Sequence, residues 1–142
     1  MGFDVVIGNP PYVGLQSMKN ESESLSKLGY ETFDKTGDLY VLFCERGNQI
    51  LKNNGGLSFI IPNKWMSAGY GKSLRRYLIA KTNPLSIIDF EKVFVFDEAV
   101  VFVCILSISK QSFDNKIKSV VIINRNQMFD FENEFKNRSV ET

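Results

Sequence analysis

The sequence contains no histidine, and this absence removes several classes of catalytic site at once. Ser-His-Asp and Cys-His centres, His general bases and His-ligated zinc all require an imidazole ring. The net charge is only +1, so no global excess of positive charge indicates a nucleic-acid partner. A local basic patch would still be sufficient to bind one.

Cysteines and long apolar runs are also scarce. Cys44 and Cys104 are the two cysteines, and both lie in apolar stretches, which suits a reduced protein better than a disulfide framework. The longest apolar run, residues 99–106, is far too short to span a bilayer. No signal peptide precedes Asp4. We therefore expect a soluble, cytoplasmic protein.

The most informative segment that is present is Asn9-Pro10-Pro11-Tyr12, directly behind the apolar run 3–8. That run predicts a buried, parallel strand. The two prolines fix their φ angles and remove two backbone donors, so the strand is followed by a stiff loop. Open α/β sheets bind their ligands at this carboxyl edge.

Such a loop suits methylation of a planar amino group. The Asn9 side-chain oxygen and the Pro10 carbonyl can accept hydrogen bonds from the two amino protons, which would favour a pyramidal nitrogen with a free lone pair. Tyr12 offers a flat face for a base, and base stacking is worth roughly 1–3 kcal/mol. A base inside a duplex would first have to be flipped out.

The remaining sequence predicts one α/β domain. The polar stretch 13–37 lacks periodicity, and we expect a lid or disorder there. A helix is expected from an Asp38 N-cap to a stop at residues 53–56. Further strands are predicted at 57–61, 86–90, 100–109 and 116–124, and a second helix at 67–81. The alternating first half predicts a parallel sheet, and the closing strands predict antiparallel additions.

The strand followed by Asn9-Pro10-Pro11-Tyr12 resembles the catalytic motif of S-adenosylmethionine-dependent amino-group methyltransferases. Over residues 3–124 the order of motifs is similar to that of gamma-class DNA adenine-N6 methyltransferases of restriction–modification systems. The resemblance implies a partial Rossmann-like fold, S-adenosylmethionine as cofactor and double-stranded DNA as partner. It assigns catalysis to Asn9, Pro10 and Tyr12 and requires no metal.

Three further segments carry the resemblance. The segment from Asp38 to Glu45 is similar to the next family motif, which implies that Phe43 stacks on the adenine of the cofactor and that Pro11 lines the same pocket. An ordinary core aromatic is the alternative for Phe43. Residues 57–65 resemble the strand and loop that would place Lys64 and Trp65 on the catalytic edge.

Residues 94–106 resemble the turn between the last two strands of the family sheet. An aromatic in that turn would pack against the flipped base, opposite Tyr12. Phe96 matches best, being three residues before Ala99. Phe94 is the fallback, although a place in the core is the expected one for it.

One departure from the family is large. Only eight residues precede Asn9, too few for the glycine-rich cofactor turn that comes first in the gamma order. We therefore expect residues 1–124 to be the catalytic half of a methyltransferase domain, with 125–142 as a polar tail or linker. The cofactor-binding half and a target recognition domain would lie elsewhere in the same polypeptide or in a partner subunit.

Three alternatives remain open at this stage. The same tetrapeptide serves protein-glutamine and RNA adenine methyltransferases. A non-catalytic remnant that contacts DNA is the third possibility. Basic residues near the second helix could contact phosphates or simply form a solvated face; they are Lys64, Lys72, Arg75, Arg76 and Lys81.

Overall fold

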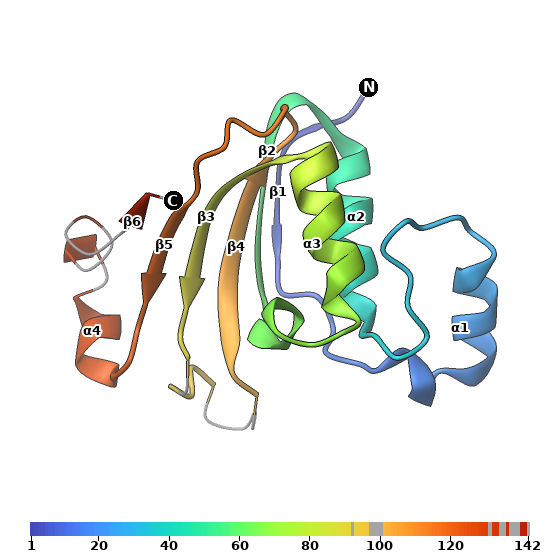
Figure 1. Cartoon of the computed structure of the whole chain (residues 1–142), viewed down its shortest axis with the longest axis horizontal. Coiled ribbons are helices and arrows are strands. Elements are labelled where there is room, and N and C mark those ends of the chain that lie inside the picture. The colour runs from blue at the N-terminus through green and yellow to red at the C-terminus, as the bar shows by residue number, and fades with distance from the viewer. Residues whose placement is uncertain (92, 97–100, 131, 134–135, 137–139, 142) are drawn as a thin grey trace.

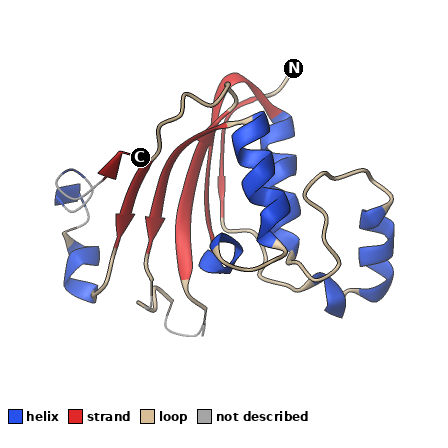
Figure 2. Ribbon diagram, viewed as in Figure 1, coloured by secondary structure: helices blue, strands red, loops and turns tan. Residues whose placement is uncertain are grey.

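The computed structural model describes residues 1–91, 93–96, 101–130, 132–133, 136 and 140–141. Within them, six strands form one twisted sheet, and helices α2 and α3 cover one of its faces (Figures 1 and 2). The strands are β1 (Phe3–Gly8), β2 (Leu51–Pro62), β3 (Asn83–Asp89), β4 (Val103–Ser109), β5 (Lys118–Val121) and β6 (Val140–Glu141). The helices are α1 (Lys19–Ser26), α2 (Leu39–Ile50), α3 (Gly71–Lys81) and α4 (Arg125–Phe129), with 3-10 turns η1 (Leu15–Ser17) and η2 (Asn63–Met66).

The described strands lie in the order β1-β2-β4-β3-β5-β6. β1 is parallel to β2, and β4 is antiparallel to both β2 and β3. The mixed α/β sheet expected from the sequence is therefore confirmed. The antiparallel direction is right for β4 but wrong for β5, which is parallel to β3. The reason is the connection between β4 and β5. The chain leaves β4 at one end of the sheet, passes over β3 at that end and enters β5 from the same end (Figure 1). β5 therefore runs opposite to β4 and parallel to β3.

Side chains at alternate strand positions belong to two hydrophobic clusters, because successive residues of a strand point to opposite faces of the sheet. On β2, Phe59 and Ile61 join the cluster under α2 and α3, whereas Ile60 packs on the other face. The first cluster also holds Leu74 and Leu78 from α3. The second gathers Ile88, Phe90, Val93, Val103, Val120 and Ile122.

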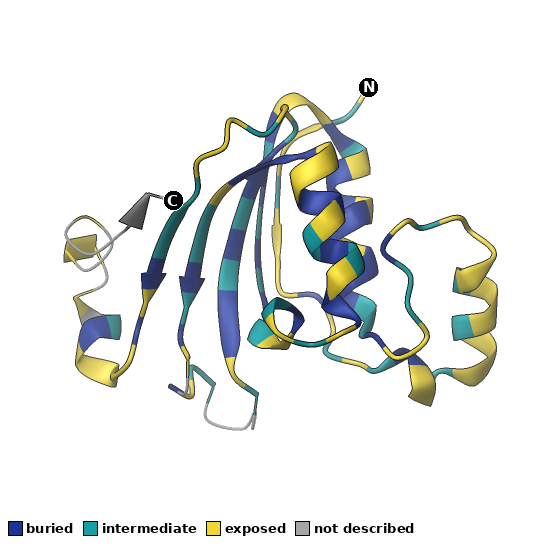
Figure 3. Cartoon of the chain, viewed as in Figure 1, coloured by how far each residue is buried: buried dark blue, intermediate teal, exposed yellow. Residues whose placement is uncertain are grey.

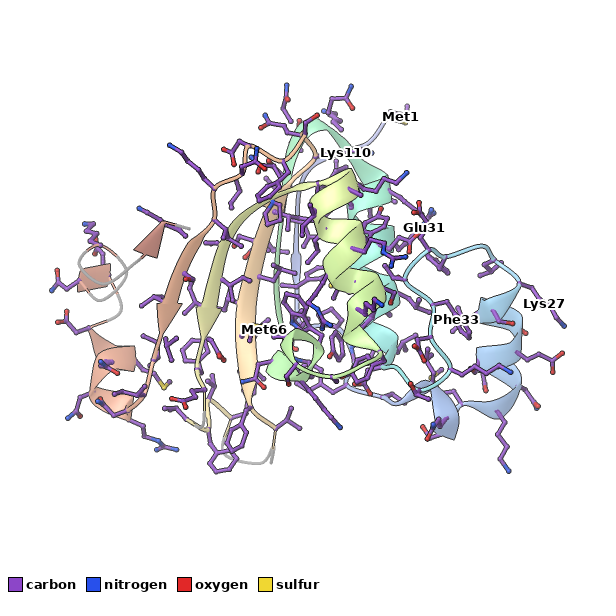
Figure 4. The ribbon with its side chains drawn as sticks, in the orientation of Figure 1. Met1, Lys27, Glu31, Phe33, Met66 and Lys110 are labelled. Atoms are coloured by element: carbon purple, nitrogen blue, oxygen red, sulfur yellow. The ribbon has the colours of Figure 1, made fainter. Side chains whose placement is uncertain are left out.

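Helix α2 ends at Ile50, earlier than the stop expected at residues 53–56. The Lys110 ammonium, at the upper edge of the sheet in Figure 4, donates to the carbonyls of Gln49 (3.0 Å) and Leu51 (2.7 Å). A cation in this position stabilises the carbonyl-rich end of a helix. The Asn53–Gly56 stretch lies within β2, where Asn54 adopts a φ of 67°.

The polar stretch 13–37 is not irregular throughout, because it contains η1 and α1. The sequence prediction missed α1 because none of its residues is buried, so it has no apolar stripe to detect. The part that follows α1 is fixed by a buried carboxylate on α2. Glu45 accepts hydrogen bonds from the Thr32 amide (2.9 Å), the Thr32 hydroxyl (2.8 Å) and the Glu31 amide (3.2 Å).

Strand β1 lies at one edge of the sheet formed by the described strands, and it is largely exposed (Figure 3). Val5 is 65% and Ile7 75% accessible, so the prediction of a buried strand is wrong for these residues as they stand. Only Val6 packs against the main cluster. An apolar strand whose second edge is unpaired is a template for association with another strand.

We expect the 142-residue polypeptide on its own to self-associate through β1. Size-exclusion chromatography should show species larger than the monomer, and Ile7→Lys should shift them toward the monomer because edge charges oppose strand pairing. Ile79→Lys is the matched control, since Ile79 is also exposed but lies on α3. A stable monomer that binds S-adenosylmethionine tightly in calorimetry would contradict this expectation.

Candidate active site

The Asn9-Pro10-Pro11-Tyr12 loop leaves β1 at the carboxyl edge of the parallel strands. Gly8 is still paired with Phe59 of β2, and the loop begins immediately after it. Pro10 is buried, whereas Asn9 and Pro11 are exposed. The predicted position of the motif, directly behind a parallel strand, is confirmed.

Backbone hydrogen bonds tie the far end of this loop to the start of α2. The Leu39 amide donates to the Val13 carbonyl (2.8 Å), and the Leu15 amide donates to the Gly37 carbonyl (2.9 Å). Between them, Gly14 and Asp38 form an isolated antiparallel bridge. The loop therefore has two fixed ends, β1 on one side and α2 on the other.

Tyr12 is half-buried, and its hydroxyl donates to the Ile60 carbonyl at 3.3 Å. The pKa of the phenol is raised, first by burial and then by the nearby Cys104, and a hydrogen bond with the Asn9 side chain partly offsets this. The phenol is therefore neutral at physiological pH. Its ring packs against the second hydrophobic cluster.

A cavity of about 420 Å³ opens beside Tyr12. Its lining combines apolar, polar and charged groups: Tyr12, Asp38, Pro62, Asn63, Lys64, Ser67, Val101 and Phe102. A larger hollow of about 630 Å³ lies between α1 and residues 33–36, but it includes no residue of the motif loop. The cavity beside Tyr12, in contrast, is lined by a residue of the motif loop.

Asp38 stands at the N-cap position of α2 as predicted, yet its side chain makes no capping bond. Its carboxylate instead accepts a hydrogen bond from the Tyr70 hydroxyl (2.7 Å), which also lies 3.0 Å from the Tyr40 hydroxyl. Burial raises the pKa of Tyr70 to about 12. This chain of polar groups holds the cavity side of α2 against the segment before α3.

A second polar cluster joins the ends of β2 and β3 at the same edge. Asn63 donates to the Asp89 carboxylate (2.9 Å) and to the Glu91 carbonyl (3.3 Å), and the Glu91 amide also donates to Asp89 (3.0 Å). Glu91 has a φ of 44°, a left-handed conformation that is uncommon for a residue with a side chain. These bonds set the direction in which the chain leaves β3.

Phe96, the predicted partner of Tyr12, is partly buried against the same hydrophobic cluster as Tyr12. The rest of its turn, residues 97–100, lies outside the described residues. Phe94 is 41% exposed and stacks on Phe102, with ring centroids 4.9 Å apart, so its predicted place in the core is wrong. The exposed flank of Phe102 lines the cavity.

The two predicted cofactor contacts, Phe43 and Pro11, are both on the surface. Phe43 is 41% exposed on α2, one turn from Leu39, so it is not the ordinary core aromatic considered as an alternative. A hollow of about 140 Å³ lies beside it, lined by Leu25, Tyr30, Leu39, Leu42 and Arg46.

Residues 1–96 match the family of Eco57I restriction-modification methylases, which is more than half of the chain. The chain belongs to this family.

The chain is similar to the type II restriction enzyme and methyltransferase RM.Eco57I of Escherichia coli. The two are 34% identical over 116 residues, 80% of this chain and 12% of that protein. The adenine-specific methyltransferase BrxX of Escherichia coli O9:H4 is 29% identical over 77 residues, 54% of this chain and 6% of BrxX. Among eight of the curated relatives, the chain spans between 6% and 22% of the relative's own length.

Solved structures show the same fold. A Listeria monocytogenes protein assigned to the class I S-adenosylmethionine-dependent methyltransferases superposes with a TM-score of 0.63 at 20% identity, covering 96% of this chain and 42% of that one. The partial methyltransferase fold is therefore confirmed. S-adenosylmethionine is the methyl donor of this family and fold, as the sequence predicted. None of the helices in the described part of the chain has the length and apolar character needed to cross a bilayer.

The other residues predicted at this edge of the sheet differ in their exposure. Lys64 is exposed at the cavity, whereas Trp65 is buried in the main cluster. Arg75, one of the basic residues considered for phosphate contacts, donates to the Trp65 and Ala68 carbonyls and thereby braces η2. No local pattern indicated that Asn63 and Phe102 line the cavity, because their positions depend on how β4 pairs with β2.

Proposed function

We propose that this chain supplies the target-base side of a DNA adenine-N6 methyltransferase in a restriction–modification system. The observation that carries the proposal is the position of the Asn9–Tyr12 loop at the carboxyl edge of the sheet, with Tyr12 lining a cavity of about 420 Å³. Membership of the Eco57I restriction-modification methylase family supports DNA as the substrate. The relative named adenine-specific supports adenine as the target.

In this proposal the chain acts by positioning. The exposed Asn9 amide oxygen and the Pro10 carbonyl would accept the two protons of the target amino group. Tyr12, held by its bond to the Ile60 carbonyl, would present one ring face to the flipped base, with Phe96 near its other side. Fixed polar groups and a fixed orientation supply the rate enhancement, without a covalent intermediate on the protein.

S-adenosylmethionine would supply the electrophilic methyl group. Phe43 and Pro11 would contact it, and the exposure of both, with the apolar hollow beside Phe43, fits that assignment. The bond between Leu39 and Val13 links the cofactor side to the target side, since it joins α2 to the motif loop. We further propose that residues 1–124 form the catalytic half and that 125–142, including α4, lead toward a target recognition domain.

The proposal is tested with the complete enzyme, meaning the polypeptide or complex in which this chain carries out methylation. Labelled S-adenosylmethionine is offered with duplex DNA, RNA and protein in separate reactions, and the products are hydrolysed to nucleosides and amino acids. We expect the label in N6-methyldeoxyadenosine. Label in methylcytosine, in RNA or in methylglutamine would each contradict the proposal.

A further inference from the structure

Lys64 carries an exposed ammonium group in the lining of the Tyr12 cavity. No ion pair or hydrogen bond joins its side chain to another residue that the structure describes. The acid in the described lining, Asp38, is already engaged, because its carboxylate accepts a hydrogen bond from the Tyr70 hydroxyl (2.7 Å). The positive charge of Lys64 is therefore uncompensated within the described lining of the cavity.

The backbone that carries Lys64 is fixed on both sides. The Asn63 amide donates to the Phe102 carbonyl at 3.0 Å. On the other side, the Lys64 carbonyl accepts hydrogen bonds from the amides of Ser67 (3.2 Å) and Ala68 (2.9 Å). Because these bonds hold the Cα of Lys64 in place, its flexible side chain can reach only the region around the cavity.

A hydroxyl group accompanies the Lys64 charge in the lining of the cavity. Ser67 is exposed and directly follows η2, whose last residue, Met66, is labelled in Figure 4. The Ser67 hydroxyl lies 3.5 Å from the Lys64 carbonyl, which is long for a hydrogen bond between two oxygens, so an anionic acceptor would readily replace this contact. Lysine and serine are among the side chains that contact DNA phosphates.

The kind of anion follows from what the cavity would hold. In the proposed function, a flipped nucleotide places its base beside Tyr12, and the base remains covalently joined to its sugar and to the phosphates on either side. The DNA backbone must therefore pass over the rim of the cavity, where Lys64 and Ser67 lie. A phosphodiester group is thus the anion that would meet this charge.

We infer that Lys64 and Ser67 form a subsite for one phosphodiester group next to the target nucleotide. The inference rests on the proposed function and deepens it, because it assigns a backbone contact that orients the flipped nucleotide. It also separates Lys64 from the basic residues of α3. Lys72 is exposed on α3 and is not part of the described lining, and Arg75 is bonded to backbone carbonyls.

The test is equilibrium binding of the complete enzyme to its target duplex at several salt concentrations, with S-adenosylhomocysteine present to prevent turnover. Each contact between a cation and a phosphate adds about 0.9 to the negative slope of log K against log salt concentration. Lys64→Gln should remove one such contact. Raising the salt from about 50 to 200 mM should then weaken its binding about 3-fold less than that of the wild type. Lys64→Arg keeps the charge and should behave like the wild type.

Neutral backbone groups locate the contact. The phosphates on either side of the target adenine are replaced, one at a time, by methylphosphonate, which carries no charge. One of these replacements should weaken binding by the wild type but not by Lys64→Gln, because the two changes remove the same interaction. Ser67→Ala should weaken binding to the unmodified duplex without changing the salt slope, since a hydroxyl group carries no charge. Lys72→Gln is the matched control and should keep the wild-type slope.

Three outcomes would overturn the phosphate subsite. They are a wild-type salt slope for Lys64→Gln, an equal effect of each methylphosphonate on Lys64→Gln and on the wild type, and an equal change of slope for Lys72→Gln, which would indicate a general effect of net charge. Failure of the wild type to methylate DNA adenine, measured on the same preparation, would instead overturn the proposed function.

Discussion

Asn9→Ala should abolish adenine methylation by the complete enzyme while leaving cofactor binding largely intact. The Asn9 side chain is exposed at the end of β1, so its loss removes an acceptor for the target amino group without opening the core. Removing one preorganised polar group from a transition state costs about 10²- to 10³-fold in kcat, and here the group would also orient the nucleophile. Cofactor contacts are assigned to Phe43 and Pro11, which the substitution does not change.

The measurement is single-turnover methylation together with calorimetric titration of S-adenosylmethionine. Asn9→Asp keeps acceptor oxygens at the same position and should retain part of the activity. Asn53→Ala is the matched control, because Asn53 is an exposed asparagine near the start of β2, remote from its catalytic end. Full activity of Asn9→Ala would contradict the catalytic assignment of Asn9. An inactive wild type with intact DNA binding would favour a non-catalytic remnant.

Gly71→Ala should be the most destabilising single-methyl addition near the site. A Cβ at Gly71 would overlap the Trp65 carbonyl oxygen and lie only 2.6 and 2.7 Å from the carbonyl carbon and Cα of Trp65. These are backbone atoms, so no side chain can rotate away. We expect a loss of about 3 kcal/mol, at the upper end of typical overpacking costs.

Gly69→Ala is a control two residues away, because a Cβ there meets nothing within 4 Å. Its effect should stay within about 0.5 kcal/mol. Thermal unfolding of the complete enzyme, followed with limited proteolysis near η2, measures both. Equal melting temperatures for the two variants would show that α3 does not need its close approach to Trp65.

Local signals predicted much of the fold. The apolar run before Asn9, the helix after Asp38 and the buried strand ending at Pro62 all carry a strong period or a proline boundary, and each is present. Helix α3 begins at Gly71 and not at residue 67, because residues 67–70 form the tight turn that follows η2. Such a turn depends on packing with Trp65, which no local pattern reveals.

The parts that the sequence did not predict are set by long-range pairing. The direction of β5 depends on the path of the chain over β3, and the exposure of β1 depends on what lies beside it. Phe102 lacked a signal because it falls inside the predicted strand 100–109, where an apolar residue is expected to lie in a core, whereas β4 begins only at Val103. Its place at the cavity follows from the register in which Val103 meets Pro62.

The bridge between Gly14 and Asp38 has a consequence for how the chains of this family could diverge in length. The chain leaves the site at Gly14 and returns to it at Asp38, so residues 15–37 form a loop whose two ends are held together by this bridge. The entropy of closing a loop grows only slowly with its length. Insertions at the exposed tip near Gly29, beyond α1, would therefore lengthen this loop without shifting the motif loop. Related proteins could therefore differ in the length of the segment 15–37 while keeping the same motif loop.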